Sequence, residues 1–375
     1  MRWSHLAAGV PPPAADRPLA AGERTPAGGA QPAGGAPADE LPLKLPGAVA
    51  RRFDTPGFAG MTFYEIRSKS IINRVPGASR VPFEWTINPY RGCGHACVYC
   101  FARNTHSYLD LDPGADFDRR IVVKVNAGEL LRRELAAPRW HGDPIAMGTN
   151  VDCYQRAEGK YRLMREILAA LRDFANPFSI LTKGTLILRD LDLLRQAAEV
   201  TDVRLAVSVG LVDEALWRSV EPGTPSPRRR LDVVRTLTDA GFAVSVLMAP
   251  ILPGLTDHEE SIADTVAAVA AAGAASLTPL VLHLRPGARE WYQQWLARNH
   301  PGLVDHYRDL YAGGSYAPGA YQREVTARVR EAARRHGLAG DQPAAGDQPE
   351  VGDQPEPARP WRGRPAARVE QPTLW

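Results

Sequence analysis

The alternation of apolar segments with amphipathic stretches, between about residues 60 and 336, is the feature that most constrains the fold. Apolar segments suited to strands occupy 83–88, 145–149, 178–182, 203–209, 242–248 and 276–282. Amphipathic stretches with helical spacing follow most of them, at 160–174, 188–199, 227–240 and 257–272. This order predicts parallel strands that are joined by right-handed helical crossovers.

The strand-like segments are almost continuously apolar, which is typical of a parallel sheet whose outer face is covered by helices. An α/β fold with an open or partial (β/α)6 barrel, similar to a TIM barrel, is therefore our first expectation. A doubly wound sheet is the second. In both architectures the functional side chains gather at the carboxyl ends of the strands.

The two ends of the chain differ in composition from this region. Residues 1–50 include 29 Ala, Pro or Gly residues, and the motif Gly-Asp-Gln-Pro occurs three times at a six-residue period from Gly340. Such segments contain too little apolar surface to offset the entropy lost on folding. We therefore predict a disordered tail over 1–50, a core with extensions over 51–336, and a disordered linker with a terminal peptide over 337–375.

No apolar run approaches the roughly 20 residues that cross a bilayer, which argues against a membrane protein. The apolar patch at 6–10 is too short for a secretory signal, so we expect a cytoplasmic protein. The formal net charge of +3 neither requires nor excludes a nucleic-acid partner.

Three cysteines follow the first expected strand with the spacing Cys-x3-Cys-x2-Cys: Cys93, Cys97 and Cys100. Three thiolates on one loop suit zinc, copper(I) or an iron–sulfur cluster. A closed structural zinc site needs a fourth ligand, for which His95 and Cys153 are the candidates. Three ligands leave one metal position open, as a catalytic metal requires.

This cysteine spacing, with an aromatic residue before the last cysteine, resembles the signature of the radical S-adenosylmethionine (radical SAM) superfamily. Over roughly 60–336 the chain is similar to the branch related to spore photoproduct lyase, and within it to an actinobacterial subfamily. The strings that carry this resemblance are Asn88-Pro89-Tyr90-Arg91-Gly92-Cys93, Gly148-Thr149-Asn150, Leu181-Thr182-Lys183 and Ala249-Pro250.

The resemblance implies that Cys93, Cys97 and Cys100 bind a [4Fe–4S] cluster and that S-adenosylmethionine binds the fourth iron. One-electron reduction then yields a 5′-deoxyadenosyl radical that removes a hydrogen atom from a substrate. A lyase- or oxidoreductase-like enzyme and an electron donor such as flavodoxin or ferredoxin are implied. The protein supplies ligation, orientation and exclusion of water.

The resemblance also implies which residues contact S-adenosylmethionine. Tyr99 and Ala249 are expected near the adenine, and Ser208 near the ribose. Thr149 and Asn150 correspond to positions that contact the methionyl part of the cofactor.

Lys183 matches a cofactor-contacting lysine of the lyase. Its simpler interpretation is a solvated strand end that pairs with Asp190. The run 228–230 is interpreted as a solvated helix face rather than a DNA contact, and His95 as an exposed loop residue.

Cys153 is a separate candidate. The lyase uses a further cysteine as a hydrogen donor, beside its counterpart of Thr149, where this chain has none. Cys153 is either a displaced donor or, more commonly for a lone cysteine, a buried inert thiol.

The chain ends in Gln371-Pro372-Thr373-Leu374-Trp375, which resembles the peptide motif that binds the bacterial sliding clamp. Gln371, Leu374 and Trp375 would contact the clamp. Nucleic-acid repair or modification is the favoured function. The alternatives are radical modification of a peptide or small molecule, and a non-catalytic, zinc-containing DNA-repair accessory protein.

Overall fold

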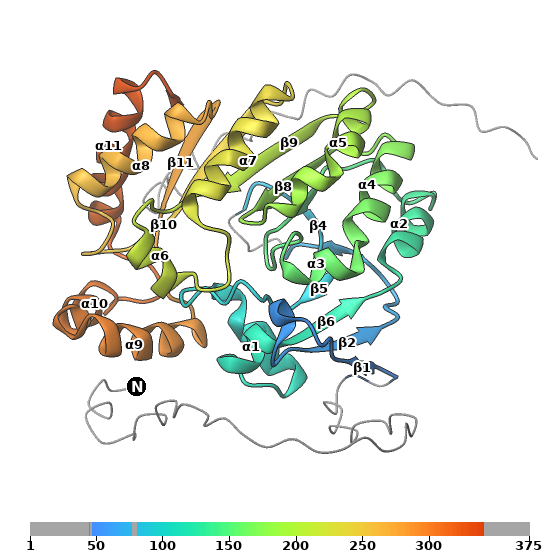
Figure 1. The fold of residues 1–375 in the computed structure, drawn as a ribbon, viewed down its shortest axis with the longest axis horizontal. Helices are drawn as coiled ribbons and strands as arrows, with labels where there is room; N and C mark the ends of the chain where they lie inside the picture. The colour runs from blue at the N-terminus through green and yellow to red at the C-terminus, as the bar shows by residue number, and fades with distance from the viewer. Residues whose placement is uncertain (1–44, 46, 77–80, 341–375) are drawn as a thin grey trace, which may run out of the picture. The chain divides into compact units, whose positions relative to one another are not determined.

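The computed structural model describes residues 45, 47–76 and 81–340, all within one compact unit that contains two sheets (Figure 1). The larger sheet has the order β12-β11-β10-β9-β8-β7-β4-β3. Six neighbouring strands are parallel, as predicted: β4 (Trp85–Ile87), β7 (Ile145–Met147), β8 (Phe178–Thr182), β9 (Val203–Ser208), β10 (Val244–Ile251) and β11 (Ser276–Val281).

The edges of this sheet differ from each other. The strand β3 (Ile72–Arg74) pairs antiparallel with β4, whereas β12 (Ala339–Gly340) pairs parallel with β11. Among the described residues no strand pairing joins these two edges. The boundary predicted between residues 336 and 337 falls just before β12.

Helices connect the parallel strands and cover the sheet, which confirms the predicted α/β class. The crossover helices are α3 (Arg156–Tyr161), α4 (Leu163–Asp173), α5 (Leu191–Ala198), α6 (Glu214–Val220), α7 (Pro227–Asp239) and α8 (Glu259–Ala271). In Figure 1, α4, α5 and α7 lie across one face of the sheet. Their buried apolar side chains belong to the same hydrophobic core as fully buried strand residues such as Ile180 and Val246. Burial of this surface is the main stabilising contribution to the fold.

Two of the predicted helical stretches are interrupted. The stretch 160–174 contains the end of α3 and all of α4, separated by Arg162, whose φ of 55° is left-handed. The side chain of Glu158 accepts a hydrogen bond from the Met164 amide at 3.1 Å, which satisfies a free donor at the start of α4. The stretch 188–199 begins in the 3-10 helix η4 (Leu186–Asp190) and continues as α5.

A second, four-stranded sheet was not predicted. Its order is β1 (Val49–Arg51), β2 (Thr62–Ile66), β6 (Arg120–Lys124) and β5 (Tyr90–Arg91). Its strands are short and lie outside the regular strand–helix alternation, so periodicity gives no signal for their pairing. The predicted boundary at residue 50 falls inside β1, which pairs antiparallel with β2.

The remaining helices belong to the extensions of the core. They are η2 (Pro56–Phe58), η3 (Phe101–Leu109), α1 (Ala115–Arg119), α2 (Ala127–Leu135), α9 (Ala288–Asn299), η5 (Pro301–Leu303), α10 (Val304–Leu310) and α11 (Gly319–Arg335). None of the described helices is both long and apolar enough to cross a bilayer.

Candidate functional site

One pocket lies where the cysteine loop meets the carboxyl ends of the parallel strands. Its lining contains nine of the ten predicted site residues: Cys93, Cys97, Tyr99, Cys100, Thr149, Asn150, Lys183, Ser208 and Ala249. These residues come from the loop after β4 and from the ends of β7, β8, β9 and β10. The sheet thus brings together side chains that are up to 156 positions apart in the sequence (Cys93 to Ala249). The exception is Cys153.

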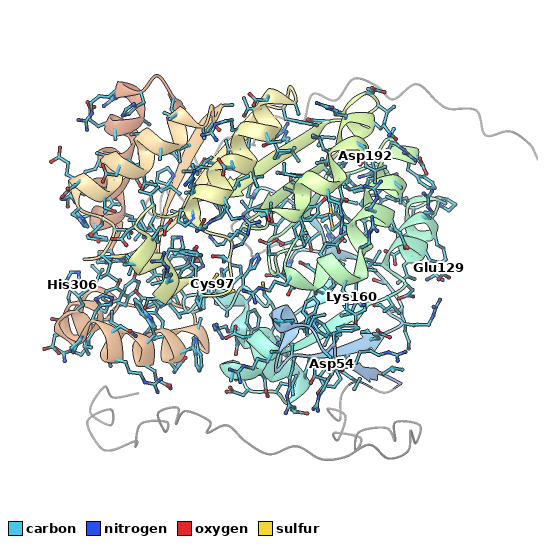
Figure 2. The ribbon with its side chains drawn as sticks, viewed as in Figure 1. Asp54, Cys97, Glu129, Lys160, Asp192 and His306 are labelled. Atoms are coloured by element: carbon cyan, nitrogen blue, oxygen red, sulfur yellow. The ribbon has the colours of Figure 1, made fainter. Side chains whose placement is uncertain are left out.

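The three clustered cysteines have free thiols. Cys93 and Cys97 are buried and Cys100 is partly buried, and Figure 2 shows Cys97 in the interior while the labelled Glu129 and Asp192 lie at the periphery. Burial raises the pKa of all three thiols. The nearby Lys183 lowers the pKa of Cys97 and Cys100 in part, and a bound metal would favour the thiolate form further.

Several hydrogen bonds fix the shape of the cysteine loop. The side chain of Gln155 accepts from the Gly94 amide and donates to the Gly92 carbonyl, both at 2.9 Å. The fully buried Arg103 donates to the Cys97 carbonyl at 2.9 Å and to Asp118 at 2.8 Å. The loop is thus held in place by neighbouring side chains as well as by its own turns.

A segment far along the chain, residues 220–224, also packs against this loop. The Val98 amide donates to the Val220 carbonyl, and the Gly223 amide donates to the His95 carbonyl, both at 3.0 Å. A β-carbon at Gly223 would lie 2.1 Å from the Gly94 carbonyl oxygen, so only glycine fits. No pattern in the sequence indicates this contact, because it depends on how the end of α6 meets the cysteine loop.

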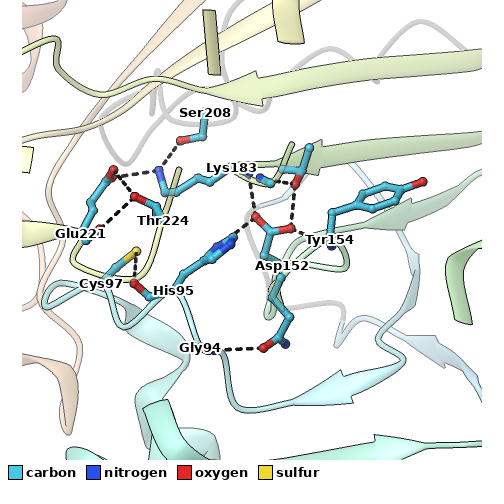
Figure 3. Close-up of polar contacts among 12 residues, drawn as sticks. Gly94, His95, Cys97, Asp152, Tyr154, Lys183, Ser208, Glu221 and Thr224 are labelled. Carbon is cyan, nitrogen blue, oxygen red and sulfur yellow. Dashed lines mark hydrogen bonds and ion pairs between the residues drawn. The ribbon is translucent and has the colours of Figure 1, made fainter. Parts of the chain in front are cut away.

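Glu221 lies at the centre of a buried group of charges that we call the inner ion network: Lys183, Glu221 and Arg230, with the hydroxyl of Tyr99. Figure 3 shows Lys183 and Glu221 of this network beside Ser208. The Lys183 Nζ donates to the Ser208 hydroxyl at 2.5 Å and lies 3.3 Å from a Glu221 oxygen. It does not pair with Asp190, whose partners include Arg165.

Glu221 and Arg230 were not predicted as site residues. Arg230 is fully buried and donates to Glu221 at 2.6 Å, which corrects the interpretation of 228–230 as a solvated face for this residue. Only Arg228 and Arg229 are exposed. Burial alone raises the pKa of Glu221, but the charges of Arg230 and Lys183 outweigh it and lower the pKa to about 2. Glu221 is thus a fixed anion behind the pocket wall.

His95 is buried rather than exposed, contrary to the expectation from the sequence. Its Nδ1 lies 3.4 Å from Asp152, which also accepts hydrogen bonds from the Thr182 hydroxyl at 2.7 Å and the Lys183 amide at 2.6 Å. Burial raises the pKa of Asp152, whereas His95 and these hydrogen bonds lower it more strongly, and the net shift is downward. Asp152 therefore links the cysteine loop to the end of β8.

The residues after β7 form one wall of the pocket, and this wall contains a hydroxyl group without a hydrogen-bond partner in the described part of the chain. Gly148 has a φ of +83°, and a β-carbon there would lie 1.7 Å from the Leu181 carbonyl oxygen, so the close approach of the two strand ends needs glycine. The hydroxyl of Thr149 is buried and has no hydrogen-bond partner within the described residues. A buried polar atom that lines a pocket without a partner fits contact with a bound polar ligand.

Cys153 lies apart from this wall. Its side chain is fully buried in the apolar core and does not line the pocket, and burial raises the pKa of its thiol. This environment is typical of an inert structural cysteine. The role of hydrogen donor stays a prediction from the resemblance.

The donor set fits an iron–sulfur cluster. In the described ranges no three His, Cys, Asp or Glu side chains converge as ligands of one metal ion. A [4Fe–4S] cluster does not need such convergence, since each cysteine binds a different iron atom. Of the two fourth ligands considered for zinc, His95 lines the same pocket but turns its Nδ1 toward Asp152, whereas Cys153 is outside the pocket lining. Gln371, Leu374 and Trp375 lie outside the described residues.

The chain matches one family model and is similar to uncharacterized proteins of other organisms. Residues 87–266 match the family model described as the radical SAM superfamily. The chain is 48% identical to uncharacterized protein Rv2578c of Mycobacterium tuberculosis over 301 residues, which cover 79% of this chain and 88% of the relative. It is 30% identical to uncharacterized protein MJ0683 of Methanocaldococcus jannaschii over 203 residues, 54% of this chain and 72% of that protein.

Solved structures show the same fold. A spore photoproduct lyase complexed with dinucleoside spore photoproduct matches with a TM-score of 0.56 and 15% identity, over 74% of this chain and 80% of that chain. A double mutant of the lyase with bound AdoMet and dinucleoside spore photoproduct matches with a TM-score of 0.55 and 16% identity, over 74% and 79%. The sequence match, the cysteine loop and this fold agree, and the chain belongs to the radical SAM superfamily.

Proposed function

We propose that this protein is a radical SAM enzyme in which Cys93, Cys97 and Cys100 bind a [4Fe–4S] cluster that leaves one iron open to S-adenosylmethionine. The observation that carries the proposal is the pocket itself. Three thiols and six further residues predicted to contact the cofactor line one cavity at the carboxyl ends of parallel strands. This is where α/β folds bind their ligands.

With both groups bound, the site supplies reductive cleavage of S-adenosylmethionine to a 5′-deoxyadenosyl radical that removes hydrogen from a substrate. The chain's own residues orient and enclose the reactants. The unsatisfied hydroxyl of Thr149 offers a hydrogen bond to the methionyl part of the cofactor. Apolar side chains of the lining, including Leu247 and Leu282, exclude water from the reacting atoms.

Lys183 positions the ribose side of the pocket. Its ammonium group donates to the Ser208 hydroxyl at the end of β9 and to the Ala249 carbonyl near the end of β10. Glu221 balances the charge of Lys183 and keeps it in this place. Because the network is already formed in the protein, cofactor binding needs little rearrangement of these side chains.

We further propose a nucleic-acid substrate. Support comes from the likeness of the fold to a lyase whose solved structures contain a dinucleoside photoproduct. Since likeness of fold alone does not fix a substrate, radical modification of a peptide or small molecule remains the alternative within enzymes. A zinc-containing accessory protein without catalysis is the alternative outside them.

Anaerobic reconstitution with iron and sulfide separates the enzyme from the accessory protein. We expect about four iron atoms per chain, a brown protein with broad violet absorption, and release of 5′-deoxyadenosine that requires dithionite. Flavodoxin or ferredoxin should replace dithionite as the electron donor. Stoichiometric zinc, with no 5′-deoxyadenosine formed, would overturn the proposal.

The substrate class is tested by isotope transfer. Deuterated oligonucleotides, peptides and small molecules are supplied to the reconstituted enzyme, and deuterium in 5′-deoxyadenosine is measured by mass spectrometry. Transfer from an oligonucleotide alone is the expected result. Transfer from a peptide alone would contradict the nucleic-acid assignment and leave the radical chemistry intact.

A further inference from the structure

A stack of aromatic rings lies beside the pocket, at the end of β11. We call Phe101, His283 and Tyr316 the aromatic stack. The ring centroids of Phe101 and His283 are 5.5 Å apart, and those of His283 and Tyr316 are also 5.5 Å apart with an interplanar angle of 26°. Phe101 and His283 line the pocket, while Tyr316 is 48% exposed. The stack therefore runs from the pocket to the protein surface.

The backbone holds the stack in place. His283 and Tyr316 form an antiparallel bridge, and the neighbouring Leu284 amide donates to the Ser315 carbonyl at 2.7 Å. Phe101 follows directly after Cys100 at the start of η3. The contact between Phe101 and His283 thus joins the cysteine loop, which follows the first parallel strand, to the end of the sixth. Rings fixed in this way lose little entropy when a ligand stacks on them.

A cation lies against the stack. The guanidinium carbon of Arg285 is 5.4 Å from the centroid of the Phe101 ring, and one guanidinium nitrogen is 3.5 Å from the Tyr316 hydroxyl. Arg285 is exposed, and none of the carboxylates in the described part of the chain forms an ion pair with it. Most other arginines around the site have such a partner, as Arg103 and Arg230 do. Arg285 is therefore available to an anionic group.

The rings of the aromatic stack are uncharged, and Arg285 supplies the positive charge beside them. Burial and the nearby Arg285 lower the pKa of His283 to about 4, so the imidazole is neutral at neutral pH. The surface then offers three uncharged rings beside one fixed positive charge. Nucleobases stack on aromatic side chains and phosphate pairs with arginine, so this combination matches a nucleotide.

We propose that the aromatic stack binds a nucleobase of single-stranded nucleic acid while Arg285 binds the adjacent phosphate. This inference deepens the proposed function, on which it rests, because the stack continues into the pocket through Phe101 and His283. A base seated on Tyr316 places the neighbouring nucleotide at the pocket entrance. An unstacked base is required, since a base inside a duplex has no free face for an aromatic side chain.

The test measures binding rather than turnover. The full-length, reconstituted protein is titrated against a fluorescein-labelled octathymidylate, and the dissociation constant is obtained from fluorescence anisotropy at several salt concentrations. We expect Tyr316→Ala to weaken binding about 5- to 100-fold and Tyr316→Phe to retain it, because the ring and not the hydroxyl stacks. Arg285→Ala should weaken binding and reduce its salt dependence by about one phosphate contact.

Two controls isolate the stacking. Tyr108→Ala removes a tyrosine that is 67% exposed and does not line the pocket, so its affinity should equal that of the unaltered protein. An abasic oligonucleotide of the same length keeps the phosphates but offers no base. It should bind more weakly than octathymidylate, and Tyr316→Ala should not weaken it further.

Three results would overturn the inference: no octathymidylate binding by the unaltered protein, equal losses in Tyr316→Ala and Tyr108→Ala, or equal affinity for the abasic strand. Binding of an aromatic-rich peptide that Tyr316→Ala abolishes, with no effect on oligonucleotide, would also overturn it in favour of a peptide site. The radical chemistry is tested separately by iron content and 5′-deoxyadenosine. Failure of the stack and failure of the proposed function are therefore distinguishable.

Discussion

The inner ion network and the aromatic stack belong to the same site but differ in how their charges are satisfied. In the network, Lys183 and Arg230 share the buried carboxylate of Glu221. Beside the stack, Arg285 is exposed and has no carboxylate partner among the described residues. The network is thus complete without a ligand, whereas the stack leaves a ring face and a cation for one.

This difference has a physical cause. A buried charge without a partner is strongly destabilising, so the charges behind the cysteine loop must be paired within the chain itself. An exposed guanidinium is hydrated and carries no such penalty. The network can therefore hold the side chains behind the pocket in place before any ligand binds, and the stack can remain open to a substrate.

The largest effect is expected from Cys97→Ala. Two thiolates cannot hold the cluster, so iron binding should be abolished, while the inner ion network and most of the fold remain. Octathymidylate binding should stay within about twofold, because the aromatic stack is untouched. Iron analysis and fluorescence anisotropy check the two parts. Full iron content in this variant would contradict the assignment of the ligands.

Glu221→Gln should have the next largest effect. It leaves Lys183 and Arg230 buried without their anion, and we expect a loss of about 3–5 kcal/mol in the free energy of unfolding, measured by urea denaturation. Glu214→Gln is the matched control, because Glu214 forms an exposed i,i+4 pair with Arg218 on α6 and should cost less than about 1 kcal/mol. Equal losses in the two variants would refute the role of the network.

The pH dependence of this loss gives a further test. The pKa of Glu221 is lower in the folded protein, about 2, than its ordinary value of 4.5. A lowered carboxyl pKa stabilises the fold above 4.5 and loses this effect as the pH falls through 2. The stability difference between the unaltered protein and Glu221→Gln should therefore be constant from pH 8 to pH 5 and shrink below pH 4.5. A stability difference that shrinks between pH 8 and pH 5 would contradict the lowered pKa of Glu221.

A smaller effect is expected from Thr149→Val. This change removes the unsatisfied hydroxyl from the pocket wall and keeps the size and branching of the side chain. The affinity for S-adenosylmethionine should fall about tenfold, which corresponds to one hydrogen bond, and stability should not fall. Isothermal titration of the reconstituted protein measures the affinity. An unchanged affinity would show that the hydroxyl does not contact the cofactor.

The smallest effect on stability is expected from Tyr316→Ala. Because Tyr316 is 48% exposed and belongs to no buried network, the free energy of unfolding should change by no more than about 0.5–1 kcal/mol. The same variant is expected to lose oligonucleotide affinity. A large loss of stability would place Tyr316 with the structural residues and weaken the contrast between the two regions.

Local patterns predicted most of the large sheet, whereas most of the residues that line the pocket were predicted from the family resemblance. The apolar runs from β4 to β11 determine parallel strands, since their side chains must be buried on both faces. The residues that follow these strands, such as Thr149 and Lys183, then necessarily meet at one edge. The small sheet formed by β1, β2, β5 and β6 was missed, because its strands lie outside the regular strand–helix alternation. The helix break was missed because the single left-handed residue Arg162 leaves little mark on the apolar spacing.

The sequence by itself determined the parallel core and the cysteine loop at its edge, because strand burial and cysteine spacing are local properties of the chain. Only the tertiary structure revealed Glu221 and Arg230 as partners of Lys183, the burial of His95, and the stacking of Phe101, His283 and Tyr316. These contacts join segments far apart in the sequence. Their pairing depends on how the helices and loops pack on the sheet, and no local pattern encodes that packing.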